Sequence, residues 1–330
     1  MKAAYIQKTG PADSIQFGDL PTPQPTGTEV RVRVTQVAVN PIDTYIRAGT
    51  IPMPIPLPYI LGCDLAGVVD AVGPQATRFA VGDRVWGTNQ GLLGRQGTFA
   101  EYAVVDDDWL YPITNDVSDE QAAAAALVGI TAHLGLVRDA KLQPGEILFI
   151  NGGTGGVGSM VVQMAKALGA TVITTAGSDA KVARCRELGA DLAINYKTED
   201  VAQQVLKFAP GGVNVFWETL REPDFDRTVS LLAERGRMIL MAGRDARPPF
   251  PVGPFYLKGC TLHGFVMFKA TAAEQRSCAE DLNRWLSSGQ IRVPIGERMP
   301  LSQAAAAHQL QEENTVGKQG TLSGKIVLAV

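Results

Sequence analysis

The sequence predicts an α/β protein with two domains, a doubly wound parallel sheet and a second domain rich in β-strands. The chain has 330 residues, which is more than a single hydrophobic core usually organises. Residues 1–125 show short strands and many turns, whereas apolar strands alternate with helices after Ser118. This alternation is typical of a parallel sheet that is covered by helices on both faces.

The N-terminal part contains several candidates for short strands. Residues 29–35 alternate apolar and polar side chains with a period of two, as a half-buried strand does, and residues 68–72 and 84–86 are further candidates. Proline occupies every second position from Pro52 to Pro58. Because proline fits neither a helix interior nor a sheet interior, this segment is expected to be an extended surface loop.

A regular succession of helices and strands begins at Ser118. We expect Ser118 to cap a helix, with Gln121 in the capping-box position. A second helix is expected over residues 155–168, where the apolar side chains fall on one face. Strands are expected at 146–150, 171–176, 191–195, 213–217 and 237–242, with helical segments between them.

Composition and charge limit the classes of function. Thirty Lys and Arg against 33 Asp and Glu give a net charge of −3 without a basic run, which disfavours binding to nucleic acid or to an anionic membrane. No apolar stretch reaches the roughly 18–20 residues of a membrane span. The four cysteines are scattered and form neither a disulfide framework nor a C-x-x-C pair. We therefore expect a reduced, cytoplasmic protein.

A glycine-rich turn carries the clearest functional signal. Residues 151–158 read Asn-Gly-Gly-Thr-Gly-Gly-Val-Gly, so Gly153, Gly155 and Gly158 form a G-x-G-x-x-G pattern between an expected strand and an expected helix. The missing side chains let the backbone approach a pyrophosphate, and the helix N-terminus supplies free N–H groups. We therefore expect a dinucleotide site of the Rossmann type here, rather than a tight turn without a ligand.

The end of the next strand indicates which dinucleotide binds. An NAD site usually places Asp or Glu there to hold the ribose 2′-hydroxyl, but this strand is followed by Gly177 and Ser178. Asp179 lies beyond the expected helix cap at Ser178, so it fits a role at the helix dipole better than a ribose contact. Lys181, assisted by Arg184, is placed to meet a 2′-phosphate, which favours NADP over NAD.

Several short motifs are spread along the whole chain. They are 39–49 (VNPIDTYIRAG), 62–67 (GCDLAG), 81–85 (VGDRV), 129–132 (GITA), 155–158 (GGVG), 165–170 (AKALGA), 194–196 (INY) and 324–328 (GKIVL). Together they resemble the medium-chain dehydrogenases/reductases, and most closely the zinc-independent NADPH:quinone oxidoreductases related to zeta-crystallin.

The resemblance implies how the chain is divided. Residues 1–127 together with 266–330 would form a GroES-like barrel, the catalytic and substrate domain, and residues 128–265 would form the Rossmann domain. The resemblance also implies a homodimer, in which the last strands of the two Rossmann sheets pair. Residues 259–268 are apolar enough to be that strand, and an unpaired sheet edge invites association.

The resemblance also bears on metal binding. Zinc-dependent relatives hold a catalytic metal with Cys and His, but Asn40 stands at the position that resembles the first cysteine ligand, and Cys63 and Asp64 replace His and Glu of a Gly-His-Glu stretch. The position of the third ligand falls within 128–131, which contains no Cys or His. Because catalytic zinc needs three protein ligands, we expect no metal.

The expected reaction follows from this absence of a metal. Alcohol oxidation lacks its usual Lewis acid, so the resemblance implies hydride transfer from NADPH to an electron-poor quinone. Tyr45 and Asn40 are implied at the mouth of the cleft, where Tyr45 would stack on the acceptor or donate a proton to it. Asn40 would contact the nicotinamide or the substrate oxygen, and Thr131 would lie against the nicotinamide or its ribose.

The implied cofactor contacts form a larger set. They are Gly153, Gly155, Gly156 and Val157 at the pyrophosphate, Ser178, Lys181 and Tyr196 near the 2′-phosphate, Gly243, Phe265 and Met267 toward the nicotinamide, and Lys325 in the closing strand. One departure concerns the loop after the fourth strand, where the family has Asp-x-x-Gly and this chain has Glu218 and Arg221 at the two ends.

Two other functions stay open. An enone or alkenal double-bond reductase would use the same site and the same hydride, so sequence motifs cannot separate it from a quinone reductase. A non-enzymatic role, as a crystallin-like protein or a binder of AU-rich RNA, is less expected because the weakly negative chain offers no basic track to RNA.

Overall fold

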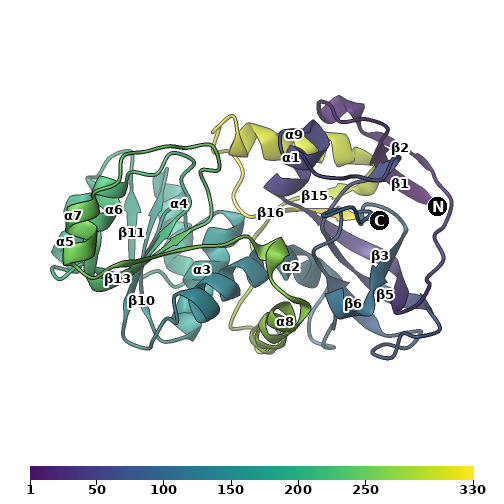
Figure 1. The fold of residues 1–330 in the computed structure, drawn as a ribbon, viewed down its shortest axis with the longest axis horizontal. Coiled ribbons are helices and arrows are strands. Elements are labelled where there is room, and N and C mark those ends of the chain that lie inside the picture. Colours follow the sequence, from purple (N-terminus) through teal and green to yellow (C-terminus); the bar gives the residue numbers. More distant parts are fainter. The chain divides into compact units, whose positions relative to one another are not determined.

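The computed structural model describes all 330 residues, Met1–Val330, and the chain divides into two compact units. Unit 1 comprises Met1–Ile130 and Ala270–Val330, and unit 2 comprises Thr131–Lys269. Each boundary lies within four residues of the one expected from the sequence. The expected fold class is confirmed, because unit 2 is built on a parallel sheet and unit 1 on mostly antiparallel strands (Figure 1).

Unit 2 contains a six-stranded sheet in which every neighbouring pair is parallel. Its strands are β9 (Ile147–Ile150), β10 (Thr171–Ala176), β11 (Leu192–Asn195), β12 (Val213–Glu218), β13 (Leu232–Leu240) and β14 (Thr261–Gly264). Its helices are α3 (Gly156–Ala167), α4 (Asp179–Glu187), α5 (Val201–Phe208), α6 (Phe225–Leu231) and α7 (Val252–Leu257), with short helical turns η3 (Leu134–Asp139) and η4 (Met267–Lys269).

The strand order β11-β10-β9-β12-β13-β14 places a change of direction next to β9. From β9 the chain moves outward to β10 and β11, and it then returns to β12 on the other side of β9. Open α/β sheets bind ligands beyond the carboxyl ends of the strands at such a point. The glycine-rich turn directly follows β9, so the topology places it at the expected edge of the sheet.

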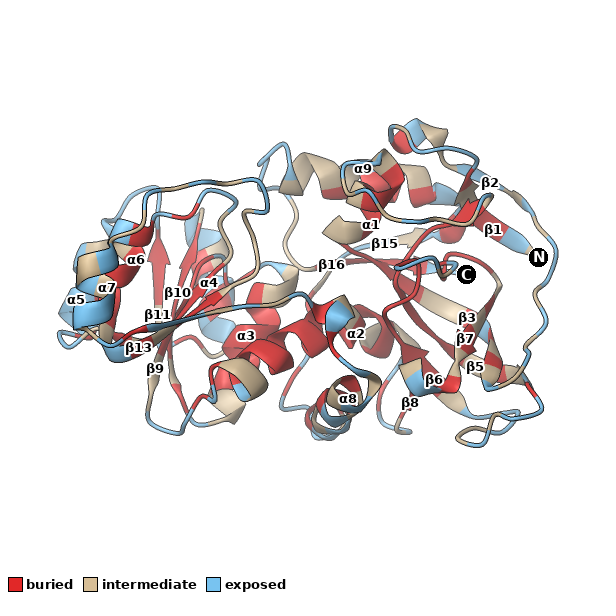
Figure 2. Ribbon diagram, viewed as in Figure 1, coloured by how far each residue is buried: buried red, intermediate tan, exposed pale blue.

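Alternation along the strands divides the apolar side chains of unit 2 between two layers. Phe149, Ile173 and Phe216 face a core that also receives side chains from α5 and α6. Phe149 and Phe216 pack with their ring centroids 4.6 Å apart. The opposite face is covered by α3 and α4, which contact β9, β10 and β11. Figure 2 shows the central strands β9, β10 and β12 and most of α3 as buried, whereas the edge strand β14 is largely exposed.

Unit 1 combines two sheets with three helices of its own. One sheet has the order β2 (Gln16–Asp19), β1 (Lys2–Ile6), β4 (Tyr59–Ile60), and the other the order β15 (Ile295–Pro300), β16 (Lys325–Ala329), β3 (Glu29–Val39), β5 (Asp64–Val72), β6 (Arg84–Gly87), β8 (Leu110–Pro112), with β7 (Tyr102–Asp106) pairing with β3. The helices are α1 (Pro41–Ala48), α8 (Ala272–Ser287) and α9 (Ala304–Thr315), with 3-10 turns η1 (Ala12–Ser14), η2 (Asp107–Trp109) and η5 (Leu301–Gln303).

Unit 1 is assembled from both ends of the chain. The C-terminal strand β16 pairs antiparallel with β3, with Ile326 opposite Val39. At this end of β3, Asn40 begins α1 in extended backbone geometry, Pro41 occupies the first helical position, and Asp43 accepts a hydrogen bond from the Asn40 backbone N–H at 2.8 Å. The closing strand therefore lies beside the start of α1.

Helix α2 (Asp119–His133) contains the division between the two units, which falls after Ile130. With η3 it forms a stretch of 21 residues that is long and apolar enough to cross a membrane by length and composition, which the sequence analysis overlooked. However, 78% of its most apolar window is buried inside the protein, as in the core helix of a globular domain.

The expected strands and helices are present, but the bounds of several differ: β3 and β5 are longer than expected, and only 261–264 of the expected last strand 259–268 is a strand. Strand β13 covers 232–240 rather than 237–242, because Leu232 pairs with Val213 before an irregularity shifts the register. Ser118 accepts a hydrogen bond from the Gln121 N–H at 3.2 Å, as expected of a cap. The Gln121 side chain does not complete a capping box, because it bonds both the N–H and the carbonyl of Val293.

Candidate cofactor and substrate site

The glycine-rich turn between β9 and α3 has no room for side chains at two positions. A Cβ on Gly158 would lie 2.1 Å from the carbonyl oxygen of Gly152, which is backbone and cannot rotate away. A Cβ on Gly153 would lie 2.5 Å from Thr174 Oγ1 and 2.9 Å from Cys185 Sγ. The close approach of turn, strand and helix therefore depends on glycine at both places.

The N-terminus of α3 is open to a ligand. Gly155 caps the helix in extended backbone geometry and offers no side-chain acceptor, so the first N–H groups of α3 have no side-chain partner. Gly155 is exposed, and Gly156 and Val157 are partly exposed. A helix N-terminus with accessible N–H groups and a positive dipole end suits the pyrophosphate of a dinucleotide. The residues present therefore fit the expected cofactor at this position.

Ser178, Lys181 and Tyr196 gather beyond the end of β10. Ser178 caps α4 by accepting a hydrogen bond from the Lys181 N–H at 3.4 Å. The Tyr196 ring lies over Gly177, because a Cβ there would be 2.5 Å from the Tyr196 hydroxyl oxygen. Asp179 accepts a hydrogen bond from Asn195 Nδ2 at 2.7 Å, so its carboxylate is engaged within unit 2.

A second lysine stands beside Lys181. The pKa of Lys181 is lowered by partial burial and by the nearby ammonium of Lys197. Two neighbouring ammonium groups repel each other, and an anion placed near both would relieve that repulsion. Sequence reasoning missed Lys197, although it directly follows Tyr196.

A buried carboxylate links the glycine-rich turn to the loop after β12. Glu218 is fully buried and accepts hydrogen bonds from Asn151 Nδ2 at 3.3 Å and from the Leu220 N–H at 2.8 Å. Thr219 donates its hydroxyl to the Asn151 carbonyl at 3.1 Å. Burial raises the pKa of Glu218, and these hydrogen bonds oppose the rise. Glu218 was noted in the sequence only as a departure from a motif, and the structure gives it this bridging position.

The residues expected near the nicotinamide differ in their burial and in their contacts within unit 2. Gly243 has a φ of +78°, and a Cβ there would lie 2.9 Å from the carbonyl oxygen of Arg221, so the loops after β12 and β13 touch at this point. Phe265 is partly buried and packs edge-on against Trp217 at 6.4 Å. Met267 and Thr131 are buried. Their contacts with a cofactor stay predictions.

In unit 1, Asn40 belongs to a fully buried hydrogen-bond network. Asn40 Nδ2 donates to Asp64 Oδ2 at 2.8 Å and, more weakly, to the Ala38 carbonyl at 3.4 Å. Thr88 donates its hydroxyl to Asp64 Oδ1 at 2.6 Å. Lys325, which is 4% exposed, donates from Nζ to Asn40 Oδ1 and to the Val39 carbonyl, the latter at 2.8 Å.

Asp43 and Cys63 lie next to this network. Burial raises the pKa of Asp43 to about 7, and the charge of Asp64 contributes, while a hydrogen bond with the Cys63 thiol opposes the rise. Burial also raises the pKa of Cys63, so its sulfur is a thiol rather than a thiolate. No group of three or more His, Cys, Asp or Glu side chains in the chain could hold a metal ion, and a catalytic zinc needs three protein ligands. The donor set therefore does not fit a catalytic zinc.

Tyr45 lies on α1, in the turn after Asp43, and is partly exposed. Helix α1 ends at Gly49, which has a φ of +74°, and the Thr50 N–H donates to the Tyr45 carbonyl at 3.0 Å. The Tyr45 backbone is thus held within α1 and by a hydrogen bond from the residue that follows the helix end. The expected contact of Tyr45 with a planar acceptor stays a prediction.

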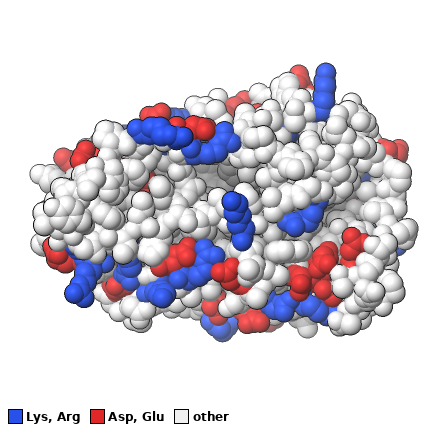
Figure 3. Space-filling view, viewed as in Figure 1, with Lys and Arg blue, Asp and Glu red and all other residues white.

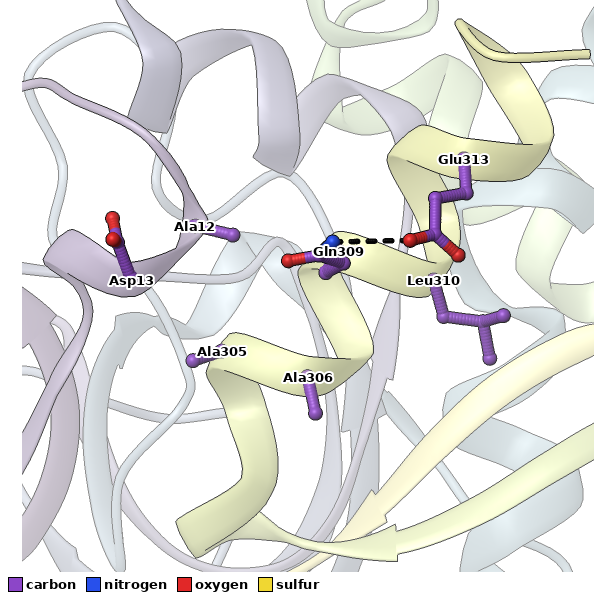
Figure 4. Close-up of a pocket in the computed structure, with 7 residues that line it drawn as sticks. All are labelled: Ala12, Asp13, Ala305, Ala306, Gln309, Leu310 and Glu313. Atoms are coloured by element: carbon purple, nitrogen blue, oxygen red, sulfur yellow. Dashed lines mark hydrogen bonds between the residues drawn. The ribbon is translucent and has the colours of Figure 1, made fainter.

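A separate groove in unit 1 does not suit the cofactor. It has a volume of about 270 Å³ and lies between η1 and α9. Figure 4 shows the residues that line it, which are Ala12, Asp13, Ala305, Ala306, Gln309, Leu310 and Glu313. Its only charged side chains are the carboxylates of Asp13 and Glu313, which would repel phosphate groups.

The surface charges are interspersed. On the face shown in Figure 3, Lys and Arg side chains alternate with Asp and Glu side chains and form no continuous basic track. The expectation that the chain does not bind nucleic acid stays a prediction.

Comparisons with known proteins identify relatives over the full length. Residues 26–115 match the alcohol dehydrogenase GroES-like domain, and residues 156–287 match the zinc-binding dehydrogenase family. The quinone oxidoreductase of Sus scrofa is 32% identical over 99% of this chain and 97% of its own length. A 2-haloacrylate reductase of a Burkholderia species is 30% identical over 93% of this chain and 94% of its own length.

Solved structures of similar proteins have the same fold over the full length. The quinone oxidoreductase of Escherichia coli in complex with NADPH is 27% identical and superposes over 100% of both chains with a TM-score of 0.87. A structure described as an NAD-dependent alcohol dehydrogenase is 30% identical over 100% of both chains, with a TM-score of 0.90.

We expect Gly158→Ala to distort the glycine-rich turn, because the new Cβ would overlap the Gly152 carbonyl. The melting temperature should fall, and the dissociation constant for NADPH, followed by the fluorescence of the bound nucleotide, should rise at least about tenfold. Gly211→Ala is the matched control, since a Cβ there has nothing within 4 Å. Tight NADPH binding by Gly158→Ala would show that the turn does not form the site.

Proposed function

Because the chain belongs to the quinone oxidoreductase family of medium-chain dehydrogenases/reductases, we propose that it is an NADPH-dependent enzyme that reduces a quinone by hydride transfer without zinc. The observation that carries this proposal is the glycine-rich turn after β9, whose two crowded glycines and open helix N-terminus suit a pyrophosphate. The full-length similarity to a quinone oxidoreductase and to a structure with NADPH supports the substrate class and the cofactor.

The preference for NADPH over NADH rests on the end of β10. Gly177 and Ser178 offer no carboxylate to a ribose 2′-hydroxyl, and Asp179 is bonded to Asn195. Lys181 and Lys197 instead concentrate positive charge there. We assign them, with Ser178 and Tyr196, to the 2′-phosphate. A structure of the same fold is described as an NAD-dependent alcohol dehydrogenase, so in this proposal the side chains at the end of β10, and not the fold, decide which nucleotide binds.

When bound, NADPH supplies a hydride from C4 of its nicotinamide ring. The chain's own residues bind and orient the nucleotide. Gly153, Gly155, Gly156 and Val157 hold the pyrophosphate in this proposal, and Thr131, Gly243, Phe265 and Met267 border the nicotinamide. Glu218 keeps the loop after β12 against the glycine-rich turn, so the nucleotide meets one fixed surface.

We propose that Tyr45 acts on the acceptor and that Asn40 faces the nicotinamide. Tyr45 is accessible, so its ring can stack on a planar quinone and its hydroxyl can donate a proton to the reduced oxygen. Asn40 is more restricted, because both Nδ2 hydrogens and one lone pair of Oδ1 are already used. Asn40 Oδ1 can still accept one hydrogen bond, which suits the nicotinamide amide better than a substrate oxygen. Asn40 is, however, fully buried rather than at the mouth of a cleft, so this contact stays a prediction.

A second substrate class has specific support. The 2-haloacrylate reductase acts, by its name, on a double bond that is activated by a carbonyl group. Such a bond and a quinone both accept hydride at an electron-poor carbon, so Tyr45 could serve either of them. We therefore retain an enone-type acceptor as the second candidate.

We also propose that the enzyme is a cytoplasmic homodimer. Strand β14 forms one edge of the parallel sheet, and Leu262 and Val266 on or after it are 43% and 42% exposed. An unpaired edge with exposed apolar side chains favours pairing with another copy.

Lys181→Ala should weaken NADPH binding at least about tenfold and leave NADH binding within about twofold, because only NADPH carries the 2′-phosphate. Isothermal titration with each nucleotide measures both constants. Lys166→Ala is the control, since this lysine pairs with Asp191 instead. Equal affinity of the unaltered protein for NADPH and NADH would overturn the cofactor preference.

Oxidation of NADPH can be followed by the loss of the absorbance of its reduced nicotinamide ring. It should be fast with benzoquinone or naphthoquinone and slower with a 2-alkenal. Tyr45→Phe should lower kcat about 10²-fold or more if its hydroxyl donates the proton, and less if the ring only stacks. Faster turnover of the alkenal would favour the second substrate class.

RNA binding in a gel shift, with no turnover of any acceptor, would support the non-enzymatic role.

Light scattering at micromolar concentration should give twice the 35.1 kDa mass of one chain. Leu262→Asp should shift the mass to that of one chain, because a charge at the sheet edge opposes pairing. Leu206→Asp is the control, since Leu206 is similarly exposed, at 41%, but lies on α5. A single-chain mass for the unaltered protein would contradict the dimer.

A further inference from the structure

Unit 1 buries a lysine in its closing strand. The Lys325 side chain is 4% exposed, and its ammonium donates hydrogen bonds to Asn40 and to the Val39 carbonyl. A buried ammonium is costly unless it is paired and hydrogen bonded. Burial lowers the pKa of Lys325, and the nearby Asp64, Asp43 and Cys63 oppose that shift.

The groups around Lys325 come from separate parts of the chain. Asn40 precedes α1, Cys63 and Asp64 lie at the start of β5, and Asp43 lies on α1. Asn40, Cys63 and Asp64 stand at positions that resemble the metal ligands and their neighbour in zinc-dependent relatives. All of these groups interact electrostatically or by hydrogen bonds with the Lys325 ammonium. The protein thus brings its own covalently attached cation to this cluster.

The hydrogen bonds of Lys325 hold the residues that directly precede α1, the helix bearing Tyr45. Lys325 Nζ donates to Asn40 Oδ1, and Asn40 Nδ2 donates to Asp64, whose other oxygen accepts from Thr88. Lys325 thereby fixes which end of the Asn40 carboxamide faces Asp64. Asn40 is also the N-cap residue of α1. Its backbone N–H donates to Asp43 in the first turn, and Lys325 also bonds the Val39 carbonyl. The ammonium therefore holds the two residues that precede the helix on which Tyr45 lies.

We propose that Lys325 is a positioning residue, an internal cation that stands in for a metal ion in this cluster, holds the Asn40 carboxamide in one orientation and fixes the start of α1. This role rests on the proposed function for its effect on turnover, since Asn40 and Tyr45 are assigned there. It differs from the predicted direct contact between Lys325 and the cofactor. Two of the three ammonium hydrogens already form hydrogen bonds inside unit 1, to Val39 and Asn40.

The test compares Lys325→Met with the double variant Asp64→Asn/Lys325→Met. Lys325→Met leaves buried carboxylates without a cation, so the melting temperature should fall by roughly 5–10 °C. Removing the charge of Asp64 as well should restore most of that loss. If Lys325→Met does not fold, the double variant still carries the measurement. The exposed pair Lys2 and Asp19 is the control, and Lys2→Met with Asp19→Asn should show no such recovery.

Turnover separates positioning from charge balance. In both Lys325 variants kcat for quinone reduction should fall at least about tenfold, while the dissociation constant for NADPH stays within twofold, because the glycine-rich turn lies in unit 2. A double variant that recovers both stability and kcat would show that Lys325 only balances charge. A large loss of NADPH affinity would show that Lys325 contacts the cofactor. Either result would overturn the proposal.

A readout without turnover keeps this proposal distinct from the proposed function. In protein labelled with nitrogen-15 at asparagine, the side-chain amide of Asn40, assigned with an Asn40→Ser variant, should exchange slowly with water. That protection should be lost in Lys325→Met and in the double variant but kept in Asp64→Asn alone, whose side-chain oxygen can still accept from Asn40 Nδ2. Unchanged protection would overturn the positioning role. Loss of protection together with no quinone reduction by the unaltered protein would uphold the positioning role and reject the proposed function.

Discussion

The close approach of Gly158 to the carbonyl of Gly152 is the constraint on which the candidate site depends. A side chain at this position would place its Cβ 2.1 Å from that oxygen, which is too close for any real contact. Strand β9 can therefore turn directly into α3 only with glycine there. The tight turn brings the helix N-terminus to the carboxyl end of the central strand. It also brings Asn151 within reach of Glu218 at the end of β12. One backbone contact thus organises the edge of the sheet where the nucleotide is proposed to bind.

Much of the fold was predictable because its signals are local. The parallel strands of unit 2 are short apolar runs between turns, and the glycine-rich turn is contiguous in sequence, so periodicity and motif were sufficient. The cap at Ser178 was predicted for the same reason, since cap and helix are adjacent. The prediction of β13 was wrong at its start, because pairing of Leu232 with Val213 depends on a neighbouring strand and not on local pattern.

The polar networks were not predictable because their members are distant in sequence. Lys325 and Asn40 are 285 residues apart, and nothing near Lys325 in the sequence distinguishes a buried cation from a surface charge. Glu218 appeared only as an altered motif residue, and its partner Asn151 lies 67 residues earlier. Lys197 adjoins a predicted site residue, yet its effect on Lys181 depends on how α4 packs against β11. Long-range pairing, rather than residue type, decided each case.

The discontinuity of unit 1 has a consequence for synthesis on the ribosome. Unit 2 is one continuous segment, so its whole sequence has been translated once Lys269 is added. The sheet of unit 1 is completed only when β16 follows, although its strand partner β3 is translated long before it. During that interval residues 36–39 of β3 lack the strand β16 that pairs with them, whereas β7 can already pair with residues 29–33. Unpaired strand edges are prone to aggregate, so translation of β16 decides when this end of β3 becomes protected.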